Sequence, residues 1–310
     1  MKIKKIISFL FVAILFGFLF WNIYRNWLII NTFPWMFNYR DLFLLILFLL
    51  PIYTLNALAW HLIIYSLGFK IDFLKSFRIW VFSNCGRFLP GAIWQYAGRI
   101  YLSSKAGISK TVALTSLVLE AVLVVMVSST TALMSVLLVP LPEHFGRLRN
   151  LLSVVVLIAW GIFLLILFFL SNDKIVNLAT GLFRKIITRG YKLEKIKINK
   201  IFIPLTIFIF FLQFLFGGIV LFFLSRFAVS LPFVQLPVFV GIYSASWLLG
   251  YLTVVAPAGL GVQEASLAGL LSFYMPFPIA SVVAIALRIS LIASELFSLL
   301  LNILISKKRR

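Results

Sequence analysis

The chain has 310 residues, of which 63% are hydrophobic and 12% are charged, and its formal net charge is +20. A soluble domain cannot bury that much apolar surface, so the composition excludes a soluble globular protein. The hydrophobic residues form continuous runs of about 20 residues or more, the length that an α-helix needs to cross a bilayer. The runs lack the alternation of membrane β-strands. The sequence therefore predicts an all-α polytopic membrane protein.

Six apolar runs are predicted to be spanning helices. They cover residues 6–24, 42–67, 109–139, 151–171, 201–225 and 277–305. The first run follows three lysines and ends without a small-residue cleavage site. We therefore interpret it as a retained anchor helix rather than a signal peptide.

Two further stretches, residues 76–104 and 237–274, are interrupted near the middle by proline and glycine. The interruptions are Leu89-Pro90-Gly91 and Pro257-Ala258-Gly259-Leu260-Gly261. Proline removes a backbone donor and glycine has no β-carbon, so each break divides a helix into two shorter pieces. Each stretch is predicted to be a re-entrant hairpin or a pair of short spans. Both options return the chain to the side from which it came.

The basic residues lie mostly at the ends of the apolar runs, where they predict topology. With the amino terminus in the cytoplasm, the predicted inner segments hold 21 Lys and Arg and the outer segments hold 5. This asymmetry predicts cytoplasmic termini and a multi-pass protein of the inner or plasma membrane. The basic segment 172–200 is then a cytoplasmic loop, which either lies on the anionic leaflet or serves only as a topology signal. Basic residues at helix ends favour lipid headgroups over nucleic acid as partners.

The orientation predicts that the two broken stretches enter the membrane from opposite sides. Each is followed by a spanning helix with a charged residue, because Pro90 precedes Glu120 by 30 residues and Pro257 precedes Arg288 by 31. We therefore predict one domain over residues 1–310 with inverted-topology units at about 76–139 and 237–305. The alternative is that such breaks recur in membrane helices without a repeat.

Charged residues within the predicted spans form a candidate network. Placing such a group at the bilayer centre costs about 2.5 to 3.5 kcal/mol on insertion scales, so it usually faces a cavity or a partner. Glu120 and Arg288 occupy equivalent repeat positions and are predicted to contact each other, while Glu295 lies two turns beyond Arg288. Either these groups line a polar pathway, or they are buried ion pairs that fix helix register.

Two arginines and a glutamine near the first break are candidates for binding an anionic headgroup. Arg87 precedes the break, and Gln95 and Arg99 share one face of the following half-helix. Guanidinium groups bind phosphate in a bidentate manner. For Arg99, the alternative is that it reaches the membrane interface. The candidate headgroup site comprises Arg87, Pro90, Gly91, Gln95, Arg99, Pro257, Gly259, Gly261 and Glu264.

The residues around both breaks resemble the lysylphosphatidylglycerol synthase transmembrane-region family. The first segment is Asn84-Cys85-Gly86-Arg87-Phe88-Leu89-Pro90-Gly91 with Trp94, and the second is Ala256-Pro257-Ala258-Gly259-Leu260-Gly261-Val262-Gln263-Glu264. The second motif, P-x-G-x-G-x-x-E followed by an arginine within a span, is the more specific. The family includes the flippase half of the bacterial multiple peptide resistance factor and stand-alone membrane proteins. The resemblance extends over nearly the whole chain and implies lipid translocation between leaflets.

The resemblance leaves several cargoes and roles open. The cargo is expected to be an anionic or aminoacylated phospholipid or a polyprenyl-linked glycolipid. Relatives that make aminoacylated lipid carry an additional synthase domain, so this chain is not expected to be an enzyme. Alternatives are a non-catalytic membrane partner of a separate lipid synthase or glycosyltransferase, and a membrane glycosyltransferase, for which the outer loops offer few acids. One cysteine and two distant histidines predict no metal site, and no cofactor is expected.

Overall fold

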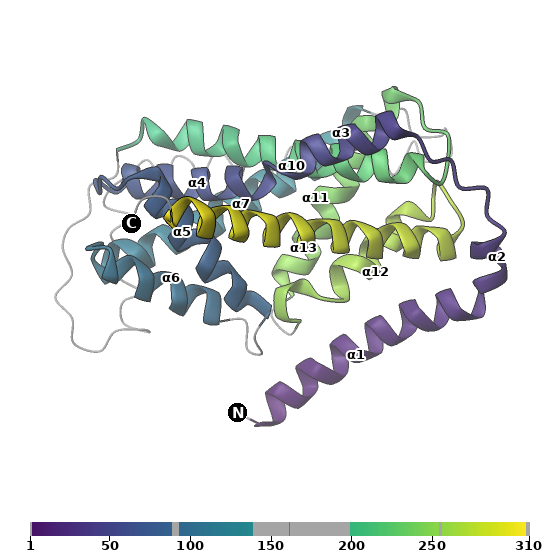
Figure 1. Cartoon of the computed structure of the whole chain (residues 1–310), viewed down its shortest axis with the longest axis horizontal. Helices are drawn as coiled ribbons and strands as arrows, with labels where there is room; N and C mark the ends of the chain where they lie inside the picture. Colours follow the sequence, from purple (N-terminus) through teal and green to yellow (C-terminus); the bar gives the residue numbers. More distant parts are fainter. Residues whose placement is uncertain (1, 89–92, 139–160, 162–198, 254–255, 308–310) are drawn as a thin grey trace.

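A computed structural model describes residues 2–88, 93–138, 161, 199–253 and 256–307 (Figure 1). These residues form α-helices and short 3-10 turns, with no strand among them. The predicted span 151–171 lies outside the described residues except for one position, and so does nearly all of the predicted loop 172–200. Pro90 and Gly91, at the centre of the first break, also lie outside them.

The amino-terminal half contains a long first helix, two shorter helices in line, and the first broken stretch. Its elements are α1 (Lys2–Arg25), α2 (Trp27–Asn31), α3 (Tyr39–Leu49), α4 (Ile52–Ser66), α5 (Phe73–Asn84), η1 (Cys85–Phe88), α6 (Trp94–Lys105) and α7 (Lys110–Leu138). The carboxy-terminal half has a long helix, the second broken stretch and a second long helix. Its elements are α10 (Phe202–Arg226), η3 (Phe233–Gln235), α11 (Leu236–Leu252), η4 (Pro257–Gly259), α12 (Val262–Leu271) and α13 (Phe277–Lys307).

Five helical segments of the described chain are long and apolar enough to cross a membrane. They are Tyr39–Ser66, Lys110–Ser135, Phe202–Arg226, Phe233–Leu252 and Phe277–Leu304. Four of them correspond to predicted spans, so the prediction of an all-α multi-pass membrane protein is confirmed. The helix predicted at residues 6–24 is present as α1, although it is not among the five.

The second broken stretch has unequal limbs. Its first limb, Phe233–Leu252, is long enough to span a membrane, whereas α12 has only 10 residues. The first stretch is more even, since α5 and α6 have 12 residues each. Whether either stretch is re-entrant or a pair of short spans stays a prediction.

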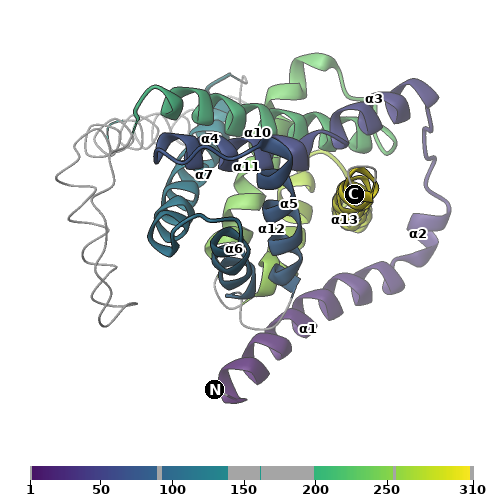
Figure 2. The same ribbon diagram turned by 60° about the vertical axis from the view of Figure 1, so that its left-hand side comes forward.

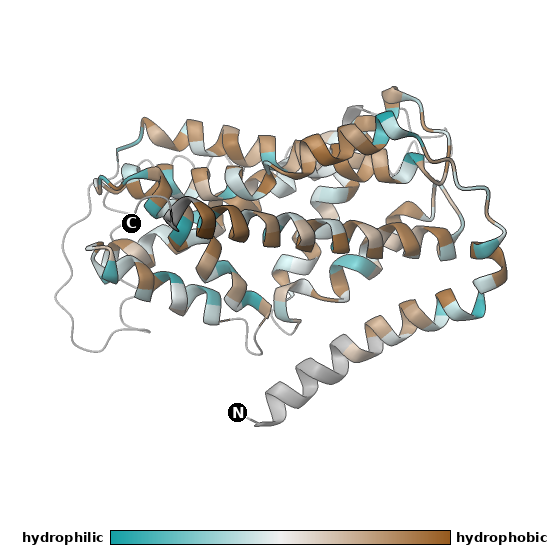
Figure 3. Ribbon diagram, viewed as in Figure 1, coloured by the Kyte–Doolittle hydropathy of each residue, from teal (hydrophilic) through white to brown (hydrophobic). Residues whose placement is uncertain are grey.

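Helix α10 runs antiparallel to α3 and α4, and contacts at its two termini define the two ends of the bundle. At one end, here called the Ser66 end, the backbone N–H of Asn199 donates to the carbonyl of Ser66 at 2.6 Å. At the other, the Arg226 end, Arg226 forms an ion pair with Asp41 at 2.9 Å. Helix α10 also packs against α7 and α11. Figure 3 shows that α10 and α13 are mostly hydrophobic along their length, whereas α6 carries many hydrophilic residues.

The two broken stretches begin at opposite ends of this bundle. Helix α5 follows the Ser66 end of α4, and α11 follows the Arg226 end of α10. The turns η1 and η4, which form the described parts of the two breaks, are in contact with each other. Helix α13 packs against both α5 and α12, and Figure 2 shows it nearly end-on beside them. The breaks therefore meet inside the bundle, while the inverted repeat and the cytoplasmic termini stay predictions.

Glycines bring α10 and α11 close together, which makes the crossing sensitive to added volume. A β-carbon at Gly218 would lie 2.3 Å from the Cα of Val240 on α11. We expect Gly218→Ala to lower the free energy of unfolding by about 1 to 3 kcal/mol, the usual cost of overpacking. Gly269→Ala is the matched control, because nothing lies within 4 Å of its β-carbon in helix α12. Thermal unfolding of both variants in detergent tests this, and equal melting temperatures would contradict it.

Candidate functional site

The second break is a tight turn whose backbone requires its glycines. Gly259 and Gly261 have φ angles of +65° and +82°, in the left-handed region that glycine adopts without a steric penalty. A β-carbon at Gly259 would also lie 2.8 Å from the backbone of Gly250, so α11 passes directly against the turn. The backbone N–H of Gly261 donates to Oε2 of Glu264 at 2.6 Å. The motif therefore ends one helix, starts α12 and fixes the orientation of the Glu264 carboxylate.

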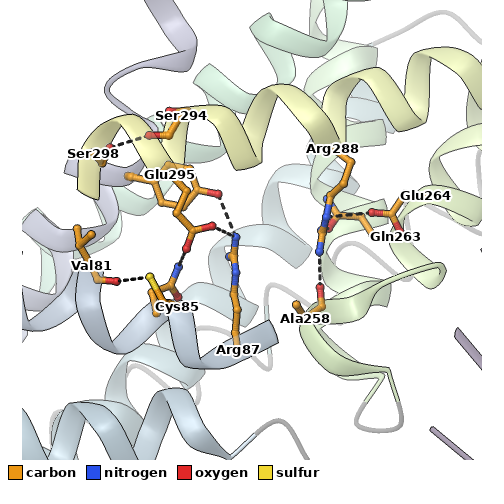
Figure 4. Close-up of polar contacts among 12 residues, drawn as sticks. Val81, Cys85, Arg87, Ala258, Gln263, Glu264, Arg288, Ser294, Glu295 and Ser298 are labelled. Atoms are coloured by element: carbon orange, nitrogen blue, oxygen red, sulfur yellow. Dashed lines mark hydrogen bonds and ion pairs between the residues drawn. The ribbon is translucent and has the colours of Figure 1, made fainter. Parts of the chain in front are cut away.

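Arg288 of α13 is held by the second break. Its Nε lies 3.3 Å from Oε1 of Glu264, which is almost completely buried. Its Nη1 donates to Oε1 of Gln263 at 2.9 Å, and its Nη2 donates to the carbonyl oxygen of Ala258 at 3.1 Å (Figure 4). One arginine thus ties the long helix α13 to both the turn η4 and the first turn of α12.

Arg87 of the first break is held by the same long helix. Its Nη2 donates to Oε2 of Glu295 at 2.6 Å and to the Tyr53 hydroxyl at 3.1 Å. The other oxygen of Glu295 accepts a hydrogen bond from Nδ2 of Asn84 at 2.7 Å. Figure 4 shows Arg87 reaching from η1 toward α13, near Arg288, which reaches from α13 toward η4. The two breaks therefore connect to α13 through separate ion pairs.

The third ion pair joins Arg99 of α6 to Glu120 of α7. Nε of Arg99 also donates to Oγ of Ser83 at 3.0 Å, and Nε1 of Trp80 donates to Glu120 at 3.0 Å. Arg99 is only 4% exposed, so the interpretation that it extends to the membrane interface is wrong. The predicted contact between Glu120 and Arg288 is also wrong, because the half-helix α6 packs on α7 and supplies Glu120 with a different arginine.

A cavity of about 340 Å³ lies where the breaks meet. Six of the predicted site residues line it: Arg87, Gln95, Arg99, Glu120, Gly259 and Arg288. Glu264 and Glu295 are not on its wall, and each instead pairs with an arginine that is. Pro257 and Gly261 shape the turn without lining the cavity. Among the charged residues, the wall therefore presents three guanidinium groups and the carboxylate of Glu120, while Glu264 and Glu295 lie behind the arginines.

The aromatic part of the cavity wall was not predicted from the sequence. Its members are Tyr53, Trp80, Tyr96, Phe210, Tyr243, Trp247 and Tyr251. Trp247 and Tyr251 lie four residues apart just before the second break, and residues at that spacing share one helix face. This spacing is the feature of the sequence that could have identified the two residues as part of one surface. Among the described residues, no group of three or more His, Cys, Asp or Glu side chains is placed to hold a metal ion.

Charge reversal tests the observed pairing of Arg99 with Glu120. We expect Arg99→Glu and Glu120→Arg each to lower the melting temperature of the purified protein, because each leaves two like charges in a buried position. The double variant should recover part of that loss, since opposite charges again face each other. The matched control combines Glu120→Arg with Arg288→Glu and should show no recovery. Recovery in the control rather than in the Arg99 pair would contradict the assignment.

The comparisons with known proteins give one result that covers the whole site. A comparison with curated proteins gives no match. Residues 5–298 match the family model described as lysylphosphatidylglycerol synthase TM region. This range contains both breaks and all three ion pairs on the cavity arginines. The chain therefore belongs to the lysylphosphatidylglycerol synthase transmembrane-region family, as its two motifs predicted.

Proposed function

We propose that the protein moves lipids with an anionic headgroup between the two leaflets of a cell membrane. Membership of the family gives the chain a role connected with membrane lipids. The proposal that lipids with an anionic headgroup are moved rests on the cavity between the two breaks, which has Arg87 and Arg288 on its wall. The broken stretches that contribute to it begin at opposite ends of the bundle. Such a site suits a headgroup that enters from one side of the membrane and leaves on the other.

Desolvation is the main barrier to lipid movement between leaflets. A charged headgroup in hydrocarbon loses its water without gaining hydrogen bonds, and this makes unassisted crossing slow. Arginine keeps its charge in such surroundings and offers several donors in a planar fork. At Arg288, two of these donors now bond to the neutral oxygens of Gln263 and Ala258, which a phosphate oxygen can replace. The arrangement therefore supplies a substitute for water partway across the bilayer.

The tails of a bound lipid must stay in the bilayer, so the cavity must open to the outer surface of the bundle. Ile93 lines the cavity and is 63% exposed, so the cavity extends to the outer surface beside the start of α6. The headgroup can then occupy the polar interior while the acyl or prenyl chains remain in the bilayer. The desolvation cost falls on the headgroup alone, and the cavity reduces that cost.

Reconstitution of the full chain into liposomes tests the proposal. Fluorescent phospholipids with anionic headgroups are placed in both leaflets, and a membrane-impermeant quencher reports how fast the inner population reaches the outside. We expect faster exchange than in protein-free liposomes and in liposomes with an unrelated polytopic protein. Exchange no faster than in these controls for every anionic lipid tested would overturn the proposal. Copurification of a lipid-modifying enzyme with no exchange would instead favour a partner role.

A further inference from the structure

The cavity has an aromatic wall in addition to its arginines. Trp247 and Tyr251 of α11 are stacked, with ring centroids 4.8 Å apart and planes inclined by 14°. The buried ring of Phe214 forms a T-shaped contact with Trp247, with centroids 5.1 Å apart, and supports the indole. Both stacked residues line the cavity. Aromatic side chains of this kind offer a flat apolar face together with a polar atom at the rim.

Polar side chains border the aromatic wall, and one of them has an acceptor atom without a hydrogen-bond partner. Gln213 lines the cavity and is 2% exposed, and its Oε1 has no hydrogen-bond partner in the described part of the chain. A buried acceptor without a donor is costly, so a ligand hydroxyl that donates to it would be favoured. Asn56, Gln95 and Tyr243 also line the cavity and add amide and hydroxyl groups. This wall suits a ligand with several hydroxyls.

The carboxylates around the cavity are already engaged, which disfavours a cationic headgroup. Glu120, which lies on the wall, bonds to Arg99 and Trp80 through its two oxygens. Glu295 bonds to Arg87 and Asn84, and Glu264 is engaged by Arg288 and by its own helix cap. An ammonium group would therefore meet guanidinium groups, while each of these three carboxylates is already paired with an arginine. Like charges at close range repel strongly where water is excluded.

We infer that the headgroup carries a hydroxylated ring, such as a hexose or a cyclitol, attached to the lipid through a phosphate. The phosphate binds between Arg87 and Arg288, and the ring lies against the side of the stacked Trp247–Tyr251 pair that lines the cavity, near Gln213. The cavity volume of about 340 Å³ is in the range of small-molecule sites. This inference rests on the proposed function and names its substrate class.

Lipid binding to the full chain in nanodiscs tests the inference. Phosphatidylinositol carries both the ring and the phosphate, phosphatidylglycerol lacks the ring, and lysylphosphatidylglycerol adds ammonium groups. We expect phosphatidylinositol to bind at least tenfold more tightly than phosphatidylglycerol, and lysylphosphatidylglycerol to bind most weakly. Free inositol 1-phosphate should compete weakly, because it lacks the lipid tails. Competition stronger than that of phosphatidylinositol would overturn the assignment to a lipid and indicate a soluble ligand.

Variants of the aromatic wall separate recognition of the ring from general folding. Trp247→Leu should bring phosphatidylinositol binding down to the level of phosphatidylglycerol, and Trp247→Phe should keep most of the preference. The matched control is Trp27→Leu on α2, an exposed residue away from the cavity, which should leave the preference unchanged. If Trp247→Leu does not fold, Tyr251→Leu serves as the second variant. A preference that survives loss of the aromatic face would overturn the inference.

The binding experiment and the exchange experiment test different claims, so one claim can be overturned while the other stands. A clear preference for the ring without any leaflet exchange would overturn the proposed function and leave the binding site in place. Exchange with equal binding of all three lipids would overturn the ring assignment and leave the proposed function in place. Tightest binding of lysylphosphatidylglycerol would contradict the charge argument directly.

Discussion

Replacing Arg288 with glutamine should lower the rate of leaflet exchange at least tenfold. Glutamine keeps a polar side chain but loses the charge and the planar fork that hold a phosphate. A hydrogen bond to a charged group contributes about 1.5 to 3 kcal/mol, and each 1.4 kcal/mol corresponds to a tenfold change in rate. Arg87→Gln should have a similar effect, since both guanidinium groups line the same cavity. Quencher-based exchange rates in liposomes measure both variants.

Arg226→Gln is the matched control for this experiment. Arg226 also forms an ion pair with a buried carboxylate, at 2.9 Å from Asp41, and its guanidinium lies over Phe222 and Phe233. It lies at the end of the bundle and does not line the central cavity. We expect its exchange rate to stay within about twofold of the unmodified protein, because its guanidinium group does not line the cavity that holds the headgroup. An equal loss in Arg226→Gln and Arg288→Gln would show that the effect is structural and would contradict the proposed role.

Helix α13 is the common support of the two breaks. Arg288 and Glu295 are seven residues apart, which is two helical turns, so they project from one face. Arg288 engages η4 and the start of α12, and Glu295 engages η1 and the end of α5. If either break shifted along α13 as a rigid unit, Arg288 or Glu295 would therefore lose its present partner and need another. The positions of the two breaks are thereby coupled to the ion pairs at the cavity wall.

The location of the charges could be predicted from the sequence, but their pairing could not. The cost of burying an ionisable group marks Glu120, Arg288 and Glu295 wherever they occur in an apolar run. Helices α7 and α13 are apolar on nearly every face, so their periodicity does not show which way a given residue points. Equivalent depth in a repeat suggested that Glu120 meets Arg288. Which half-helix packs beside Glu120 depends on three-dimensional packing.

The aromatic wall was missed for a related reason. Tryptophan and tyrosine in membrane proteins are usually assigned to the interface between lipid and water. Trp247 and Tyr251 lie near the end of a long apolar segment, where that assignment is the natural one. Only the turn at η4 folds α12 back against α11 and places these rings beside the cavity. The glycine motif predicted the turn, and the consequence for its neighbours required the structure.

Removing Glu295 alone should be far more damaging than removing it together with Arg87. Glu295→Ala leaves Arg87, whose side chain is 23% exposed, without its carboxylate. Breaking a fully buried pair costs about 3 to 5 kcal/mol, so we expect a somewhat smaller loss here. Replacing both partners by apolar residues of similar volume is often neutral. We therefore expect the double variant R87M/E295L to regain most of the lost stability, although Asn84 also loses the oxygen that it bonds to. Thermal unfolding in detergent measures the three proteins side by side.

The same double variant separates the structural role of Arg87 from its role in binding. If Arg87 only fixes the position of the first break, R87M/E295L should fold and exchange lipids at a normal rate. If its guanidinium holds the headgroup, the variant should fold and lose exchange, because the charge is missing from the cavity wall. We expect the second result, since Nε of Arg87 is buried without a hydrogen-bond partner in the described chain and remains available to an anion. A stable variant with unchanged exchange would remove Arg87 from the binding site and leave Arg288 as the principal cationic group.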